Sequence, residues 1–319
     1  MKHIVFTADD FGVVPSIDEG IRIAIRKGLV KSVAAFSNYK DSVKNVKNLL
    51  EEFPDVEMGV HLTISSGKPL NGADSNLLCD GENFRSYNDF KLDNDTKDAF
   101  LKQLEAELKA QIEVFVNNDI PVYHLSSHHN LLTFLPELYT IFLNLARSYN
   151  LKVRSPKVIP RFKQNLYLLV VRIQLFQNLG KTYLKKIKKF GKRIKVFYKK
   201  NSDGVKTLGF LDTSHYGPIP VIKIIDPMGN ILATQKYNKL IRRLWFFKFS
   251  MHRTSEFVLH LRKDDLEENS DYENEIKETK YTGIDPDYFD SRIVELRSIT
   301  KLTVDKLKNI GINPGSWKE

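Results

Sequence analysis

The chain has 319 residues, of which 42% are hydrophobic and 28% charged, and its formal net charge at pH 7 is +10. This composition is typical of a folded protein with a substantial core, and it excludes general disorder. The single cysteine, Cys79, excludes an intrachain disulfide framework and a cysteine-based zinc site.

The first ten residues are typical of a strand that ends in two acids, and not of a secretory signal peptide. No apolar run reaches the roughly 20 residues that a membrane-spanning helix requires. We therefore expect a soluble protein in the cytoplasm.

Strands and helices alternate along the first half of the chain. Apolar, β-branched runs predict strands at 3–8, 30–36, 56–62 and 121–125. Helical spacing of apolar residues predicts helices at 16–28, 41–53, 96–117 and 136–149. Ser16 and Glu19 predict a capping box for the first helix, and 63–94 is predicted to be a long irregular loop.

This alternation, with short links, indicates an α/β protein with a parallel sheet or barrel. Gly-x-Gly-x-x-Gly and Walker-type phosphate loops are absent from the sequence, which argues against nucleotide-binding folds. The spacing favours a closed or nearly closed, TIM-barrel-like (β/α) barrel over a doubly wound sheet. We expect residues 1–319 to form a single domain that carries a basic helical insertion, 161–200, on its outside.

The excess positive charge lies in that insertion. Residues 161–200 contain thirteen Lys or Arg and no Asp or Glu, so the rest of the chain is mildly acidic. The simplest interpretation is a pair of outer helices with a solvated lysine face. The alternative is peripheral contact with an anionic membrane or an acidic glycan. Specific nucleic-acid binding is not expected, because no recognised motif accompanies the charge.

Ionisable side chains collect where the predicted strands end. They are Asp9 and Asp10 after the first strand, His61 at the end of the third, His128 after the fourth, and His260 after a later apolar run. Each alone has a structural explanation, such as a helix cap or a buried core histidine. The carboxyl ends of parallel strands share one face of the barrel, so we expect these side chains to converge there.

The types of these side chains are those of a hydrolytic metal site. One Asp and two His can hold a metal ion and leave a position open, and two imidazoles favour zinc, cobalt or nickel over magnesium. A nearby carboxylate can deprotonate water, and a histidine opposite can protonate a leaving group. The pattern predicts metal-assisted hydrolysis of an acyl or phosphoryl bond.

The same residues lie in a series of short segments. The segments are Thr-Ala-Asp-Asp-Phe-Gly (7–12), Lys-Ser-Val-Ala-Ala-Phe-Ser-Asn (31–38), Gly-Val-His-Leu-Thr (59–63), Ser-Gly-Lys-Pro-Leu (66–70), His-Leu-Ser-Ser-His-His (124–129) and Arg292-x-x-Glu295-Leu296. In content and order they resemble the YdjC-like carbohydrate deacetylase family, which includes chitooligosaccharide deacetylases. The resemblance extends from residue 3 to about residue 297.

The resemblance implies a distorted (β/α) barrel that removes an N-acetyl group from an amino sugar with the help of a metal. Carried over to this chain, it implies that Asp10, His61 and His128 hold one divalent ion, with zinc expected and magnesium the alternative. It further implies that Asp9 is the base that activates the attacking water and that His260 is the general acid. The implied partner is an N-acetylated sugar.

Two further residues are candidates for substrate binding. Arg154 ends a short extended piece and is expected either to contact the sugar or to stabilise a carboxylate. His215 lies in a polar loop that is similar to a family loop, where it is expected to contact sugar hydroxyls. An exposed barrel face is also compatible with a homodimer.

Three positions depart from the family pattern. Ser126 stands where the family commonly has Asp near the metal histidine, Asn130 replaces a further histidine, and Leu261 begins the segment that replaces Pro-Gly after His260. These departures keep open a second interpretation, a carbohydrate-binding or scaffold protein on a catalytically decayed barrel. A metal-dependent phosphoesterase is a third, because the same ligand types serve that chemistry.

Overall fold

The structure is a computed structural model that describes residues 2–86, 93, 95–133, 136–158, 207–212, 254–263 and 286–318. Its elements are β1 (Lys2–Phe11), α1 (Pro15–Arg26), β2 (Ser32–Ala35), α2 (Ser42–Glu52), β3 (Glu57–Leu62), η1 (Gly72–Leu78), β4 (Cys79–Asp80), β5 (Asn83–Phe84), α3 (Lys97–Val116), β6 (Val122–Ser127), η3 (His128–Thr133), α4 (Pro136–Ser148), β7 (Lys152–Val158), β8 (Thr207–Asp212), β9 (Thr254–Leu259), α8 (Pro286–Ile299), α9 (Val304–Asn309) and β10 (Ile312–Pro314). The predicted basic insertion, 161–200, and His215 lie outside the described residues.

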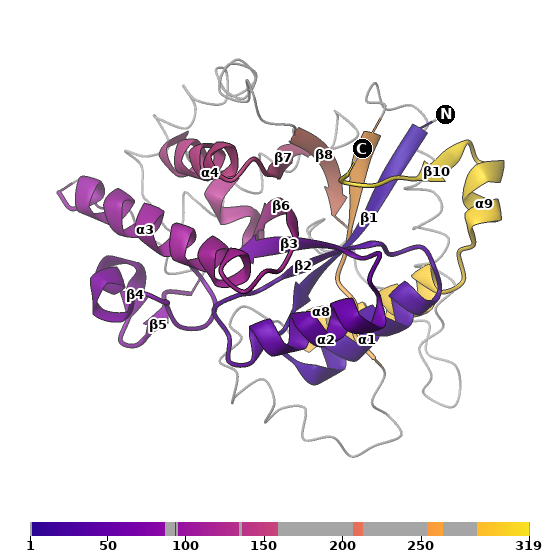
Figure 1. Ribbon diagram of the computed structural model, residues 1–319, viewed down its shortest axis with the longest axis horizontal. Helices are drawn as coiled ribbons and strands as arrows, with labels where there is room; N and C mark the ends of the chain where they lie inside the picture. The colour runs from indigo at the N-terminus through magenta and orange to yellow at the C-terminus, as the bar shows by residue number, and fades with distance from the viewer. Residues whose placement is uncertain are drawn as a thin grey trace.

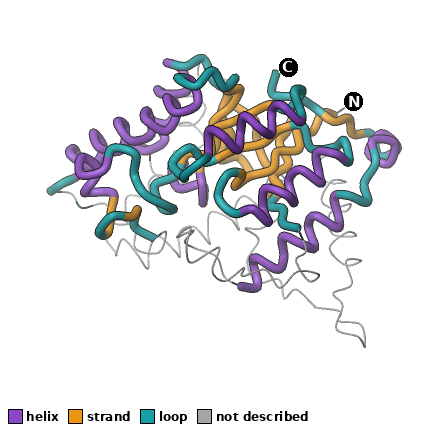
Figure 2. Tube along the Cα trace, turned by 60° about the horizontal axis from the view of Figure 1, so that its bottom comes forward, coloured by secondary structure: helices purple, strands orange, loops and turns teal. Residues whose placement is uncertain are grey.

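The strands form a parallel sheet that curls and meets itself. Its strand order is β10-β1-β2-β3-β6-β7-β8-β9, and β1 also pairs with β9. In Figure 1, α1, α2 and α8 lie together on one side of the sheet, and α3 and α4 lie together at another. Figure 2 shows the helices arranged around the central strands. The arrangement confirms the predicted distorted (β/α) barrel, and the carboxyl ends of its strands share one mouth.

Helix α1 shows why the sequence pattern predicts the helices well. Ile17, Ile21 and Ile25 recur at helical spacing, and all three are buried against the sheet. The predicted capping box is wrong, because Pro15 occupies the first turn and Val14 is the N-cap residue, with no side-chain cap. Among the helices that the structure describes, none combines the length and the apolar character that crossing a bilayer demands.

The C-terminal segment fills the end of the barrel opposite to the mouth. The Trp317 ring stacks on the ring of His124 with the centroids 4.5 Å apart and the planes 4° from parallel. The backbone N–H of Trp317 donates to Glu57 Oε2 at 2.6 Å, and the Ser316 hydroxyl contacts the same carboxylate. Burial lowers the pKa of His124 to about 3, so its ring is neutral and packs as an aromatic surface.

Gly59 of β3 makes room for this stacked pair. A Cβ atom at position 59 would lie 2.3 Å from His124 Cε1, which is far inside van der Waals contact. We expect Gly59→Ala to destabilise the protein by about 1–3 kcal/mol, the usual cost of overpacking a core. Urea unfolding measures this, and in a His124→Ala background the cost of the same change should largely disappear. Equal costs in both backgrounds would contradict the packing described.

Candidate metal centre

Asp9 and Asp10 lie within β1, near its carboxyl end. The sequence pattern had placed them after the strand. Side chains of adjacent strand residues normally point to opposite faces, so a regular strand would separate the two carboxylates. The pairing of β1 with β2 shifts register between Ala8 and Phe11, and Asp10 has a φ of 72°. This bulge turns the strand end so that both acids serve the barrel mouth.

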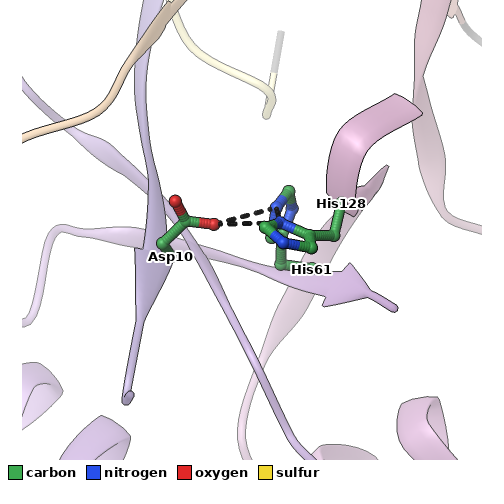
Figure 3. Close-up of side chains that lie close together, drawn as sticks. All are labelled: Asp10, His61 and His128. Carbon is green, nitrogen blue, oxygen red and sulfur yellow. Dashed lines mark hydrogen bonds and ion pairs between the residues drawn. The ribbon is translucent and has the colours of Figure 1, made fainter. Parts of the chain in front are cut away.

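Three donor atoms from three strand ends meet beside this bulge. Asp10 Oδ1 lies 3.2 Å from His61 Nε2 and 3.3 Å from His128 Nδ1. The two ring nitrogens are 3.3 Å apart, so the three atoms form a nearly equilateral triangle. Figure 3 shows both imidazoles turned toward the same carboxylate oxygen. All three side chains are buried.

The triangle fits a tetrahedral metal ion. Zinc bound to nitrogen and oxygen at about 2.0–2.1 Å places its ligand atoms about 3.3–3.4 Å apart. Burial lowers the pKa of His128 to about 4, against the opposing effect of Asp10, so this imidazole is neutral at pH 7, as a ligand must be. Asp10, His61 and His128 therefore form a buried group that could hold a metal ion.

Two contacts fix the ring of His61. Ser126 Oγ of β6 lies 2.6 Å from His61 Nδ1, and Phe36 packs edge-on against the same ring with centroids 5.0 Å apart. If Nδ1 donates its proton to the hydroxyl, Nε2 presents a bare lone pair to the triangle. Ser126, one of the three positions that depart from the expected pattern, thus contacts a residue of the triangle.

Removing this hydroxyl should weaken metal binding. We expect Ser126→Ala to lower the affinity for zinc about 10- to 100-fold, because His61 loses the partner that orients it. Competition with a chromophoric chelator measures the dissociation constant. Ser32→Ala is the matched control, since Ser32 is another buried serine of the barrel and contacts the Thr7 hydroxyl at 3.1 Å. If the Ser126 and Ser32 variants bound zinc with equal affinity, the proposal that Ser126 orients the ring of His61 would be excluded.

A buried arginine holds Asp9. Arg154 of β7 donates from Nη1 to Asp9 Oδ2 at 2.6 Å and from Nη2 to Oδ1 at 2.8 Å. Its other edge faces Glu256 of β9, with Nε and Nη2 each 2.8 Å from a carboxylate oxygen. Burial alone would raise the pKa of Asp9, but Arg154, aided by His61, outweighs it and lowers the pKa to about 2. Asp9 is therefore ionised at neutral pH.

A second arginine holds Asp10. Arg292 of α8 donates from Nη2 to Asp10 Oδ2 at 2.6 Å, and its side chain is 1% exposed. Although burial opposes ionisation, Arg292 and the two histidines keep the pKa of Asp10 well below its usual range. Because Arg292 takes Oδ2, the carboxylate presents Oδ1 to His61 and His128. Each acid of the Asp-Asp pair thus has its own buried arginine.

His260 follows β9 and completes the set at the mouth. It is buried, and its electrostatic interaction with Asp9 makes a small contribution to the lowered pKa of that carboxyl, so the two side chains are within electrostatic reach. The next residues dock on α1, where Lys263 N–H donates to the Ser16 carbonyl at 2.9 Å. Gly20 permits this approach, since a Cβ atom there would lie 2.7 Å from the Arg262 backbone.

Polar loops surround the mouth. Ser65 Oγ, after β3, lies 3.1 Å from His129 Nδ1, and both His129 and Asn130 have a positive φ of 54° directly after His128. Glu107 and Gln111 of α3 hold the loop after β3. Strained backbone of this kind concentrates at functional sites.

The structure brings Asp9, Asp10, His61, His128 and His260 to one mouth. Arg154 contacts the carboxylates of Asp9 and Glu256, and its contact with the sugar stays a prediction.

Sequence reasoning missed Glu256 and gave Arg292 no role. Glu256 directly precedes the predicted apolar run 257–259, and an acid next to a buried strand is the signal that could have revealed it.

The fold and the mouth define the class: a (β/α) barrel with a buried Asp-His-His group. The family model for YdjC-like protein matches residues 3–261. The chain therefore belongs to the YdjC-like family.

Similar proteins include several that are named carbohydrate deacetylase. A protein of Thermoanaerobacter pseudethanolicus named carbohydrate deacetylase is 30% identical over 49% of this chain and 61% of its own length. One of the same name from Listeria monocytogenes is 32% identical over 50% of this chain and 63% of its own. These matches span less than two thirds of either relative.

A solved structure shares the fold. It is that of a candidate cellobiose-phosphate cleavage protein from Enterococcus faecalis V583, with a TM-score of 0.66 and 20% identity over 99% of this chain and 98% of the other. At this identity the likeness concerns the fold alone.

Proposed function

We propose that the protein is a metal-dependent deacetylase that removes the N-acetyl group from an amino sugar. The observation that carries the proposal is the triangle of Asp10 Oδ1, His61 Nε2 and His128 Nδ1, with edges of 3.2 to 3.3 Å, beside the ionised Asp9. The name carbohydrate deacetylase of the two bacterial relatives supports the choice of substrate.

Asp10, His61 and His128 would hold the ion. Two imidazole nitrogens and one carboxylate oxygen favour zinc, with magnesium as the alternative. When bound, the ion would polarise the amide carbonyl and make water more acidic. Arg292 would keep Oδ1 of Asp10 directed at the ion, and Ser126 would do the same for Nε2 of His61.

Asp9 would be the proton acceptor. Its Oδ2 lies 3.9 Å from His61 Nε2, so the carboxylate borders the triangle. Because Arg154 keeps it ionised, Asp9 can take a proton from the water that attacks the acyl carbon. The two hydrogen bonds from Arg154 also limit rotation of the carboxylate.

His260 would be the proton donor. As the tetrahedral intermediate collapses, the C–N bond breaks and the sugar nitrogen takes a proton from His260, which releases the free amine and acetate. Asp9 then releases to solvent the proton that it took from water, and His260 takes a proton from solvent, so both side chains return to their starting states. Arg154 would act on Asp9 in this scheme. His215 remains a prediction as a substrate contact.

Acetate release tests the proposal. Zinc-loaded protein is incubated with N-acetylglucosamine and short chitooligosaccharides, and acetate is measured by an enzyme-coupled assay. We expect release that stops after chelation and returns with added zinc. Two parallel measurements test the alternative functions. Hydrolysis of p-nitrophenyl phosphate tests for a phosphoesterase, and calorimetry of sugar binding tests for a carbohydrate-binding protein. Phosphate release without acetate would favour a phosphoesterase, and sugar binding without turnover would favour a binding protein.

A further inference from the structure

Glu256 is a buried acid at the floor of the proposed site, and it does not contact the Asp-His-His triangle. Its side chain is fully buried, and both of its oxygens accept hydrogen bonds of 2.8 Å from Arg154. The other end of the same guanidinium binds both oxygens of Asp9. Glu256, Arg154 and Asp9 thus form one continuous chain of charge-assisted hydrogen bonds.

The sheet fixes the two acids relative to each other. Strands β1 and β9 are paired neighbours, with Val5 opposite Glu256 and Ala8 opposite Leu259. Arg154 reaches them from β7, which is separated from β9 by β8. Two rigid neighbouring strands therefore carry the carboxylates, and a long side chain from across the barrel connects them.

The guanidinium alone would not hold Asp9 in one orientation. The arginine side chain has several rotatable bonds. If it contacts only one carboxylate, through its two Nη atoms, the plane of the guanidinium group can still rotate. Because all five N–H groups lie in one plane, a second carboxylate on the Nε edge fixes that plane. The two hydrogen bonds from the fixed guanidinium group then hold the carboxylate of Asp9 in one orientation.

We propose that Glu256 is a positioning residue that acts through Arg154 to orient Asp9. The inference rests on the proposed function in so far as Asp9 takes the proton from water. It assigns Glu256 no contact with the sugar, with the metal ligands or with the reacting atoms.

Replacing Glu256 by Gln tests this. The amide keeps the shape but removes one acceptor and turns a donor toward the guanidinium, so Arg154 loses its anchor. We expect kcat for acetate release to fall about 10- to 100-fold, in line with the cost of a small misplacement of a catalytic group. KM and the affinity for zinc should stay unchanged, because Asp10, His61 and His128 are not touched.

Glu57→Gln is the matched control. Glu57 is another buried carboxylate of the barrel, but it holds the C-terminal segment through Trp317 at the opposite end. This variant should lower the midpoint of thermal unfolding and leave kcat as it is. An equal loss of kcat in both variants would mean that Glu256 is merely structural.

The Arg154→Met background gives the sharpest comparison. If Glu256 acts only through Arg154, Arg154→Met and Arg154→Met/Glu256→Gln should have the same kcat. The double variant should also be the more stable of the two, since it buries one fewer unpaired carboxylate. A further fall of kcat in the double variant would overturn the inference.

A readout without turnover separates this inference from the proposed function. Unfolding midpoints of Asp9→Asn, Glu256→Gln and the double variant form a cycle, and we expect clearly non-additive shifts. The cycle of Asp9→Asn with Glu57→Gln should be additive. If the wild-type protein releases no acetate, the proposed function fails, and an additive Asp9–Glu256 cycle would then reject the contact chain as well.

Discussion

Replacing Asp9 by Asn is expected to reduce acetate release about 100- to 10,000-fold, the range that a positioned general base contributes. Asparagine has nearly the same shape but cannot accept the proton of water. Asp9 is not part of the triangle, so the zinc content of the variant should match that of the wild-type protein. Initial rates and elemental mass spectrometry of the same preparation measure both quantities.

The stability of the Asp9→Asn variant serves as the control, since the change also removes a charge partner of Arg154. A folded variant that retains most of the wild-type rate would remove Asp9 from the mechanism. A variant that loses both its zinc and its activity would instead place Asp9 among the metal ligands.

Arg292→Met is expected to destabilise the protein by about 3–5 kcal/mol, because it leaves the buried carboxylate of Asp10 without its cation. A dication near Asp10 can replace part of the lost charge. Zinc should therefore raise the unfolding midpoint more in the variant than in the wild-type protein. Urea unfolding with chelator and with zinc measures both effects.

Arg297→Met is the control for this change. Arg297 lies in the last turn of the same helix, α8, and is half-buried. Its replacement should cost clearly less than that of Arg292, because Arg297 is only half-buried whereas the side chain of Arg292 is 1% exposed. Similar losses in the two variants would show that the helix surface, and not the contact with Asp10, determines the effect.

The sequence predicts the barrel because its local patterns agree with the global fold. β-Branched runs such as 3–8 form strands that are buried on both faces, and helical spacing identifies α1 to α4. Asp10, His61 and His128 could be singled out since each stands where a predicted strand ends, and parallel strands end at one mouth.

The contacts behind these side chains could not be predicted from sequence. Arg154 and Asp9 are 145 residues apart, and Arg292 and Asp10 are 282 apart, so no local period connects either pair. The bulge that directs Asp9 and Asp10 toward the same mouth depends on the register between β1 and β2. Register is a property of the assembled sheet.

The packing at the end of the barrel opposite to the mouth could not be predicted from local sequence patterns either. Residues 313–315 are typical of a non-helical tail, and β10 does lie there, but nothing in the sequence connects Trp317 with His124 or Glu57. A single aromatic residue has no periodic pattern, and the partners of Trp317 come from β1, β3 and β6.

The metal content of purified protein tests the central claim most directly. Elemental mass spectrometry should find about one zinc or similar ion per chain in the wild-type protein after reconstitution, and none in His128→Ala. Such a result would support Asp10, His61 and His128 as the ligands. No ion in the wild-type protein, or the same content in both proteins, would contradict the account of this site.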